Sequence, residues 1–214
     1  MTLEGGDSVD LSSSSLWVGA ALAALIAFVS GSLPFAPWLG RLVAKQDVRA
    51  VGDGNPGATN VFRAGGVAVG LAVLLLDVSK GVLPVVLAKG LFGLDGWALA
   101  VVAVLPVAGA AFSPFLGFRG GKALAVTLGT WIGLTIWTIP LVAIVAIVAA
   151  ALLIESRGWA VAAALAAMLL GLLLWLPSGW SVVALLLQAA IILWKHRSDL
   201  ARPPRARRLG TRPA

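Results

Sequence analysis

The chain has 214 residues, 60% of them hydrophobic and only 12% charged, and its formal net charge is +7. Soluble domains are about half apolar and about a quarter charged, so this composition excludes a water-soluble protein and indicates an integral membrane protein. The absence of cysteine and the single histidine exclude disulfides and cysteine- or histidine-rich metal sites, and we expect no metal and no cofactor.

Residues 1–15 are acidic and serine-rich, which predicts a mobile tail and not the basic start of a cleaved signal peptide. Long apolar segments follow, without the two-residue alternation of an outer-membrane β-barrel. We therefore predict an all-α, polytopic membrane domain over residues 16–195 with seven transmembrane helices. The predicted spans are 16–42, 67–91, 97–112, 123–138, 140–154, 159–175 and 180–194.

Two of these spans contain residues that are unusual inside a membrane helix. The first holds Ser32, Pro34 and Pro37, and proline interrupts helical hydrogen bonding, so we expect a kink or break there. The second holds Asp77 and Lys80, three residues apart on one helix face. Charges at this depth are costly unless they are paired or face water, and we interpret them as a structural ion pair.

A polar, glycine-rich segment at 47–66 separates the first two spans. Glycine lets the main chain approach a ligand closely, and successive N–H groups in such a turn can hold an anion. Arg63 adds a guanidinium that can grip a phosphate through two hydrogen bonds. We interpret this segment as a phosphate-binding loop at the membrane surface.

A second segment at 113–122 combines glycine with Arg119 and Lys122. Neither segment fits a nucleotide-binding motif. Residues 52–57 match G-x-G-x-x-G but lie between predicted spans, and Ala123 follows Lys122 where a P-loop needs serine or threonine. The alternative to phosphate binding is that both segments are tight turns with basic anchors.

Charge placement predicts the orientation. Most lysines and arginines lie around 41–63, 119–122, 157 and 195–212, whereas none lie around 92–96, 139–140 and 177–180. The two sets alternate, and positive loops face the cytoplasm. We therefore expect the amino terminus outside, a basic tail at 196–214 inside, and both glycine-rich loops on the cytoplasmic face. This placement favours the lipid bilayer as partner and not nucleic acid.

The last polar segments carry weaker signals. Glu155 and Arg157 lie in a short turn that we interpret as solvated, and His196 follows the last span at the membrane edge. The tail beyond it is rich in arginine and proline and has no apolar run, so we expect it to be largely disordered after its first turn.

Five motifs, in this order, resemble those of the bacterial membrane-bound acyl-phosphate:glycerol-3-phosphate acyltransferases. The resemblance covers residues 31–202. The motifs are Gly31-Ser32-Leu33-Pro34-Phe35, the segment 52–63, Leu76-Asp77-Val78-Ser79-Lys80-Gly81, Phe118-Arg119-Gly120-Gly121-Lys122 and Lys195-His196-Arg197. The resemblance implies a seven-span helical bundle in the bacterial inner membrane with an active site facing the cytoplasm.

The resemblance also implies a reaction, in which an acyl chain moves from acyl-phosphate to the sn-1 hydroxyl of glycerol 3-phosphate. The products are lysophosphatidate and phosphate. No acyl-enzyme is expected, because the hydroxyl attacks directly while a substrate phosphate takes its proton, so the protein acts by positioning and charge stabilisation. By position, the implied catalytic residues are Arg63, Lys122 and His196. The implied substrate-binding residues are Gly52, Asp53, Gly54, Asn55, Gly57, Thr59, Asn60, Gly120, Gly121 and Asp199.

The chain departs from the family pattern at several positions. Asp53 replaces a serine and Asp199 an asparagine, so two acids stand where the family has neutral donors. Further replacements are Ala110 for histidine, Ala123 for glycine, Val126 for threonine and Ala163 for serine, and a late glutamate is missing. These changes leave the alternative of an inactive or substrate-altered paralogue that binds lipid or a protein partner. A separate alternative is a small-solute transporter or channel.

Overall fold

The structure is a computed structural model that describes residues 11–207. Within them the all-α prediction is confirmed, since the only extended pairing is one antiparallel bridge between Ile154 and Ala206. The elements are α1 (Leu11–Ser32), α2 (Phe35–Leu42), η1 (Val48–Ala50), α3 (Ala58–Gly90), α4 (Gly96–Ala111), η2 (Pro114–Leu116), α5 (Leu124–Thr135), α6 (Thr138–Leu153), α7 (Arg157–Trp175), α8 (Gly179–Lys195) and α9 (Arg197–Leu200).

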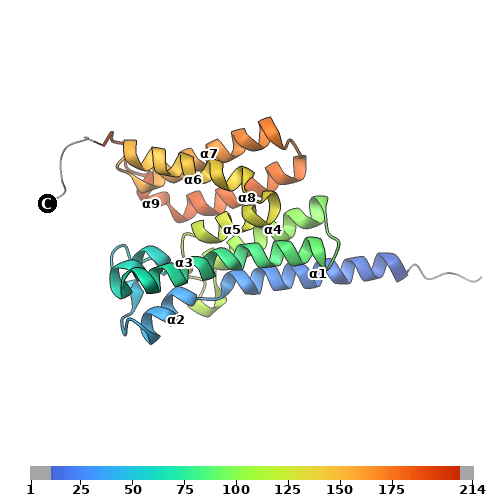
Figure 1. Ribbon diagram of the computed structural model, residues 1–214, viewed down its shortest axis with the longest axis horizontal. Helices are drawn as coiled ribbons and strands as arrows, with labels where there is room; N and C mark the ends of the chain where they lie inside the picture. The colour runs from blue at the N-terminus through green and yellow to red at the C-terminus, as the bar shows by residue number, and fades with distance from the viewer. Residues whose placement is uncertain (1–10, 208–214) are drawn as a thin grey trace, which may run out of the picture.

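The helices form a bundle with two sides. Helices α1 and α3 run together on one side, α6 and α7 pack together on the other, and α4, α5 and α8 lie between them (Figure 1). The α2–α3 connection and α9 lie at one end of the bundle, and the start of α1 lies at the other. The polar segments of the sequence are therefore gathered at a single end.

Four described stretches are long and apolar enough to cross a membrane, namely Leu16–Leu42, Ala58–Gly90, Gly96–Leu116 and Arg157–Trp175. Helices α5, α6 and α8 are apolar but shorter. The 12 residues of α5 rise only about 18 Å, less than the roughly 30 Å of a bilayer core. Helix α5 packs mainly against α3, so neighbouring protein can shield the non-helical backbone at its ends.

The predicted break in the first span is confirmed, because α1 ends at Ser32 and α2 begins at Phe35. The loop predicted over 47–66 is wrong in its second half, where residues from Ala58 onward are helical. This short helix packs Val61 into an apolar cluster with Val48 and Val73. It is separated from the long part of α3 by Gly66, which has φ 77° and ψ −175°, a conformation open to glycine.

Both ends of the described chain are more ordered than the sequence predicts. Helix α1 begins at Leu11, inside the predicted mobile tail, whose residues 1–10 lie outside the described part. At the other end, residues 201–207 turn back along the α6–α7 connection. The main-chain N–H of Glu155 donates to the carbonyl of Arg205 at 3.0 Å, and that of Arg207 donates to the carbonyl of Leu153 at 2.8 Å. Extended backbone pairing thus orders a segment of low hydrophobicity, and residues 208–214 lie outside the described part.

Small residues let α3 pack closely on α5, and a buried ion pair lies within α3 itself. A Cβ at Gly81 of α3 would collide with the carbonyl of Val126 in α5 and would lie 2.5 Å from the main-chain nitrogen of Thr130. The predicted pair of Asp77 and Lys80 is confirmed at 2.7 Å, with both side chains largely buried. Close helix packing through small residues is how membrane helices associate without a hydrophobic driving force between them.

We predict that Gly81→Ala destabilises the bundle. The added methyl has no room between α3 and α5, and overpacking costs about 1–3 kcal/mol, or several degrees in the unfolding midpoint. The control is Gly90→Ala at the end of the same helix, where nothing lies within 4 Å of the added Cβ. Thermal unfolding in detergent, followed by tryptophan fluorescence, measures both variants. Equal midpoints for the two would show that the α3–α5 contact is looser than described.

Candidate active site

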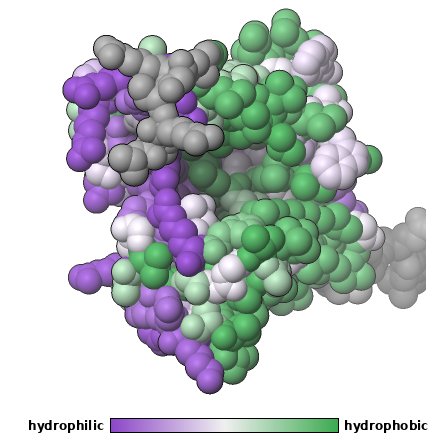
Figure 2. Space-filling view, turned by 60° about the vertical axis from the view of Figure 1, so that its left-hand side comes forward, coloured by the Kyte–Doolittle hydropathy of each residue, from purple (hydrophilic) through white to green (hydrophobic). Residues whose placement is uncertain are grey.

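A cavity of about 680 Å³ opens between the two sides of the bundle. Its polar end is lined by residues of the glycine-rich loops, including Asp53, Asn55 and Lys122. Much of the remaining wall is apolar, with Leu128 and Ile147 among its residues. Figure 2 shows hydrophilic residues gathered along one side of the molecule, beside a hollow whose visible walls are largely hydrophobic. A cavity of this kind suits an amphiphilic ligand with a charged head.

The first glycine-rich loop is held in shape by hydrogen bonds among its own side-chain and main-chain groups. Asp53 Oδ1 accepts from the main-chain N–H of Asn55 at 3.2 Å and from Asn60 Nδ2 at 3.0 Å. Asn60 Nδ2 also donates to the Asn55 carbonyl at 3.0 Å. Gly52 has φ 63°, and a Cβ there would collide with the guanidinium of Arg63. The left-handed backbone conformation therefore favours glycine at this position, and the ends of the Arg63 and Asn60 side chains lie close over it.

The second loop delivers Lys122 to the same place. The N–H of Gly121 donates to the Ala110 carbonyl at 3.0 Å, which ties the loop to the end of α4. A Cβ at Gly120 would collide with that same carbonyl. Ala123 follows with φ 58° and starts α5. The loop therefore runs pressed against α4 and turns sharply, and Lys122 lies at the turn.

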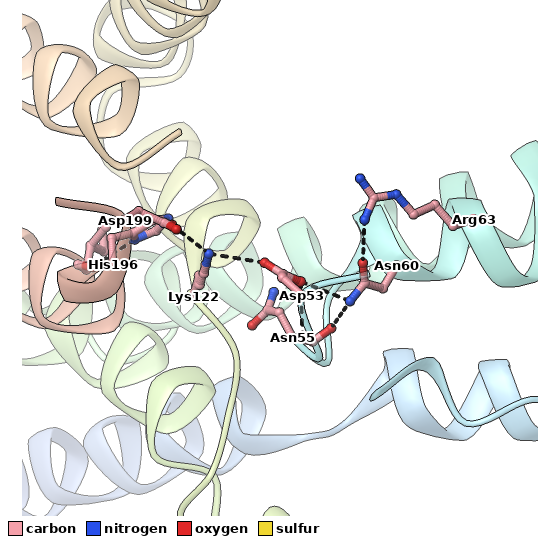
Figure 3. Close-up of polar contacts among 8 residues, drawn as sticks. Asp53, Asn55, Asn60, Arg63, Lys122, His196 and Asp199 are labelled. Carbon is pink, nitrogen blue, oxygen red and sulfur yellow. Dashed lines mark hydrogen bonds and ion pairs between the residues drawn. The ribbon is translucent and has the colours of Figure 1, made fainter. Parts of the chain in front are cut away.

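Lys122 is the centre of the polar contacts (Figure 3). Its Nζ lies 3.2 Å from Asp53 Oδ2 and 2.9 Å from Asp199 Oδ2. Burial opposes ionisation of Asp53, but hydrogen bonds from Lys122, from the N–H of Asn55 and from Asn60 hold the pKa of this carboxyl below its ordinary value. Asp53 is therefore charged at neutral pH, and the lysine is flanked by carboxylates from two distant segments.

Arg63 lies at the outer end of this chain of contacts. Its NH1 donates to Asn60 Oδ1 at 3.3 Å, and Asn60 in turn contacts Asp53 (Figure 3). The Arg63 side chain is exposed and is not part of the cavity lining. Arg63 and Lys122 thus belong to one network at one end of the bundle, although only Lys122 faces the cavity.

His196 ends α8 and lines the cavity with only 2% of its surface exposed. Its Nδ1 lies 2.9 Å from the Ile192 carbonyl, so this nitrogen carries the proton and donates it. Burial lowers the pKa of His196, and the nearby Lys122 charge acts in the same direction, against the hydrogen bond to Ile192. The ring is therefore neutral at pH 7. With the proton on Nδ1, Nε2 of the neutral ring can accept a hydrogen bond.

The structure brings the predicted site residues to one end of the bundle but gives them different positions. The cavity lining includes Asp53, Asn55, Gly57, Thr59, Gly121, Lys122 and His196. The lining does not include Gly52, Gly54, Asn60, Arg63, Gly120 or Asp199. Several of the second group shape the loops or hold residues of the first group in place.

Sequence reasoning missed the part played by the α6–α7 turn. Glu155 and Arg157, interpreted as a solvated turn, line the cavity together with Arg207 of the tail. Ser156 between them donates through Oγ to the Asp199 carbonyl at 3.1 Å. The predicted orientation could have indicated this role, because it puts the turn on the same membrane face as the glycine-rich loops.

Known proteins match this chain over nearly all of its length. The model of the glycerol-3-phosphate acyltransferase family matches residues 21–204. The chain belongs to the glycerol-3-phosphate acyltransferase family. A glycerol-3-phosphate acyltransferase of Thermus thermophilus is 40% identical over 197 residues, which is 88% of this chain and 94% of the relative. One of a Jannaschia species is 42% identical over 194 residues, covering 90% of this chain and 92% of the relative.

Solved structures of the same acyltransferase family share the fold. The crystal structure of PlsY (YgiH), an integral membrane glycerol 3-phosphate acyltransferase, in its glycerol 3-phosphate form has a TM-score of 0.76 and 31% identity, and covers 86% of this chain and 90% of that one. The lysophosphatidic acid form has a TM-score of 0.75 and 29% identity, with the same coverage. Together with the apolar helices, this similarity makes the chain a membrane protein.

We predict that removing either carboxylate beside Lys122 strengthens anion binding in this acyltransferase. Asp53→Asn and Asp199→Asn should each tighten binding of inorganic phosphate by about tenfold, because a charge several ångströms away in a partly solvated site contributes on the order of 1–2 kcal/mol. Titration calorimetry of the purified protein at pH 7.5 measures the dissociation constant. Mild acid should not mimic Asp53→Asn, since the lowered pKa of Asp53 keeps it charged there.

The matched control is Asp47→Asn, which removes the same charge from a carboxylate that pairs with Arg41 and Arg49 and does not line the cavity. Equal tightening in all three variants would mean that overall charge, and not the contact with Lys122, governs anion binding.

Proposed function

We propose that the protein transfers an acyl chain from acyl-phosphate to the sn-1 hydroxyl of glycerol 3-phosphate, giving lysophosphatidate and inorganic phosphate. The observation that carries this proposal is the single cavity that joins a glycine-lined, lysine-bearing polar end to apolar walls of α5, α6 and α7. Such a cavity accommodates a phosphate at one end and an acyl chain along the rest. Membership of the glycerol-3-phosphate acyltransferase family supports the same activity.

In this proposal Lys122 and the two glycine-rich loops hold substrate phosphate. The ammonium of lysine has three N–H donors, and the carboxylates of Asp53 and Asp199 engage two of them. The third donor remains for a phosphate oxygen. The main-chain N–H groups of Ala58 and Thr59, at the start of α3, line the cavity without an acceptor in the described part of the chain and supplement it. Arg63, the other cation among the predicted catalytic residues, would stabilise the same phosphate from outside the cavity through the field of its guanidinium.

The chemical step needs no group that the two substrates lack. The glycerol hydroxyl forms a C–O bond with the acyl carbonyl carbon, the bond from that carbon to the phosphate oxygen breaks, and the hydroxyl proton passes to the departing phosphate. Neutral His196 supports this step by accepting a hydrogen bond from the hydroxyl at Nε2, which orients the attacking oxygen. Lys122 stabilises the negative charge that develops on the carbonyl and phosphate oxygens.

Direct transfer without an acyl-enzyme is favoured by the residues of the cavity wall. The sequence has no cysteine. The wall serines are committed to structure, since Ser32 Oγ donates to the Phe28 carbonyl at 2.7 Å and Ser113 Oγ donates to the Ser32 carbonyl at 2.6 Å. Neither serine has the neighbouring base that a nucleophile requires.

The proposal includes seven spans in the bacterial inner membrane, with the amino end outside and the cavity open to the cytoplasm. Helix α1 together with α2 forms the first span, and α3 to α8 form the others. The arrangement of the basic residues supports this orientation. Arg41, Lys45, Arg49, Arg119 and the described arginines of the tail belong to segments at the end of the bundle where the cavity opens, and positive charge marks the cytoplasmic side.

We predict that purified protein in detergent releases phosphate from acyl-phosphate only when glycerol 3-phosphate is present, and forms lysophosphatidate in equal amount. Lys122→Met should lower kcat/KM by on the order of 10²–10³, as for the loss of one charge-stabilising group. Lys89→Met, at the far end of α3, serves as the control and should keep full activity. Phosphate release with lysophosphatidate quantified by mass spectrometry measures the reaction. Wild-type protein that forms no lysophosphatidate would defeat the proposal and leave the inactive paralogue in its place.

A further inference from the structure

The cationic groups of the cavity fall into two classes. Of the described residues, four lysines or arginines line it, namely Lys80, Lys122, Arg157 and Arg207. Lys80 pairs with Asp77, and Lys122 pairs with Asp53 and Asp199. Neither Arg157 nor Arg207 takes part in an ion pair within the described part of the chain. The two arginines without a carboxylate partner therefore lie together on the cavity wall formed by the α6–α7 turn and the tail. We call this part of the wall the rim.

The tail holds Arg207 at this rim through main-chain contacts. We call residues 201–207 the strap. The strap is bound by the two hydrogen bonds with Leu153 and Glu155 described above, and by Trp159 Nε1, which donates to the Arg202 carbonyl at 2.8 Å. The family model matches residues 21–204, so Arg207 lies three residues after the last residue that it matches.

The rim lies where the apolar wall ends. Ile147 and Ala151 of α6, and Ile154 just after this helix, line the cavity in succession toward the turn, and Glu155 and Arg157 come next. A single acyl chain lying along this wall would bring its head group to the two arginines. Glu155 is the one acidic residue of the rim, so the rim keeps a net positive charge.

The rim also adjoins the Lys122 cluster. Ser156 donates to the Asp199 carbonyl at 3.1 Å, and a Cβ at Gly158 would lie 2.8 Å from Asp199 Cβ. The start of α7 therefore packs on the segment that carries one carboxylate partner of Lys122. Two phosphates bound side by side repel each other, and a separate pair of guanidiniums for the second phosphate would compensate that repulsion.

We propose that Arg157 and Arg207 form a second phosphate-binding subsite, which holds the phosphate of a single-chain lipid phosphate whose acyl chain lies along α6. Resting on the proposed function, this ligand is the acyl-phosphate donor, while Lys122 serves the glycerol 3-phosphate acceptor. Arg207 is then a phosphate-binding residue supplied by the strap, and the apolar wall along α6 favours phosphates that carry a long chain over free phosphate.

Binding of hexadecyl phosphate, an unreactive single-chain phosphomonoester, tests the subsite without turnover. The full-length chain in detergent is titrated as wild type, Arg157→Gln, Arg207→Gln and Arg205→Gln. Arg205→Gln is the matched control, because it removes the same charge from the same strap at a residue that does not line the cavity. We expect the dissociation constant to rise about tenfold in Arg157→Gln and Arg207→Gln and less than twofold in Arg205→Gln. Equal effects of Arg205→Gln and Arg207→Gln, or no effect of Arg207→Gln, overturn the subsite.

Two further measurements separate the possible outcomes. Binding of inorganic phosphate should change less than twofold in all three variants, because free phosphate has no chain to anchor it at the rim. A tenfold loss of inorganic phosphate binding in Arg207→Gln would instead assign the rim to free phosphate. In the steady-state assay, Arg207→Gln should raise the KM for acyl-phosphate about tenfold and leave that for glycerol 3-phosphate unchanged. If wild type shows no turnover while the hexadecyl phosphate results hold, the proposed function fails and the subsite stands. If turnover occurs and Arg207→Gln binds normally, the subsite fails and the function stands.

Discussion

The contact of Lys122 with Asp53 and Asp199 organises the polar end of the molecule. It joins the loop before α3, the loop before α5 and helix α9, since the two carboxylates lie 69 and 77 residues from Lys122 along the chain. The lysine side chain is 19% exposed, whereas those of Asp53 and Asp199 are 38% and 32% exposed, so solvent weakens each ion pair and the contact matters mainly by joining three segments. The cavity keeps its polar end assembled because each of these segments is bound to the same side chain.

That contact also sets the electrostatics of the proposed reaction. Two carboxylates on one ammonium reduce its pull on an incoming phosphate, so the remaining cations become more important. Arg63 acts from outside the cavity, and Arg157 and Arg207 act from its rim. Asp53 and Asp199 therefore lower the net positive charge at the centre of the site without removing the lysine, and the cations unpaired within the described part of the chain lie at its edges.

Sequence patterns predicted those features of the structure that depend on residues close together in the chain. The apolar helices, the break near Pro34, the pair of Asp77 and Lys80 and the convergence of both glycine-rich loops on one end all follow from hydropathy, proline geometry and charge placement. The helix at 58–65 was missed because glycine and polar residues surround it, whereas its stability comes from Val61 packing on residues distant in sequence. The strap was missed for the same reason, since its order depends on pairing with Leu153 and Glu155. Local polarity indicates contact with water but does not say which surface the chain returns to.

Packing explains why the cavity lies where it does. Helices α1 and α4 approach closely, since a Cβ at Gly31 would collide with the Pro106 carbonyl, and α3 and α5 approach as closely at Gly129, where a Cβ would collide with the Val78 carbonyl. The cavity wall also uses small residues, including Ala143, Ala151, Ala160 and Ala164, but there no facing backbone fills the space. Small side chains thus let α1 pack on α4 and α3 pack on α5, whereas along α6 and α7 they leave the cavity open. Because apolar walls without a partner are costly in water but not around an acyl chain, this open side is best explained as the place where the lipid chain lies.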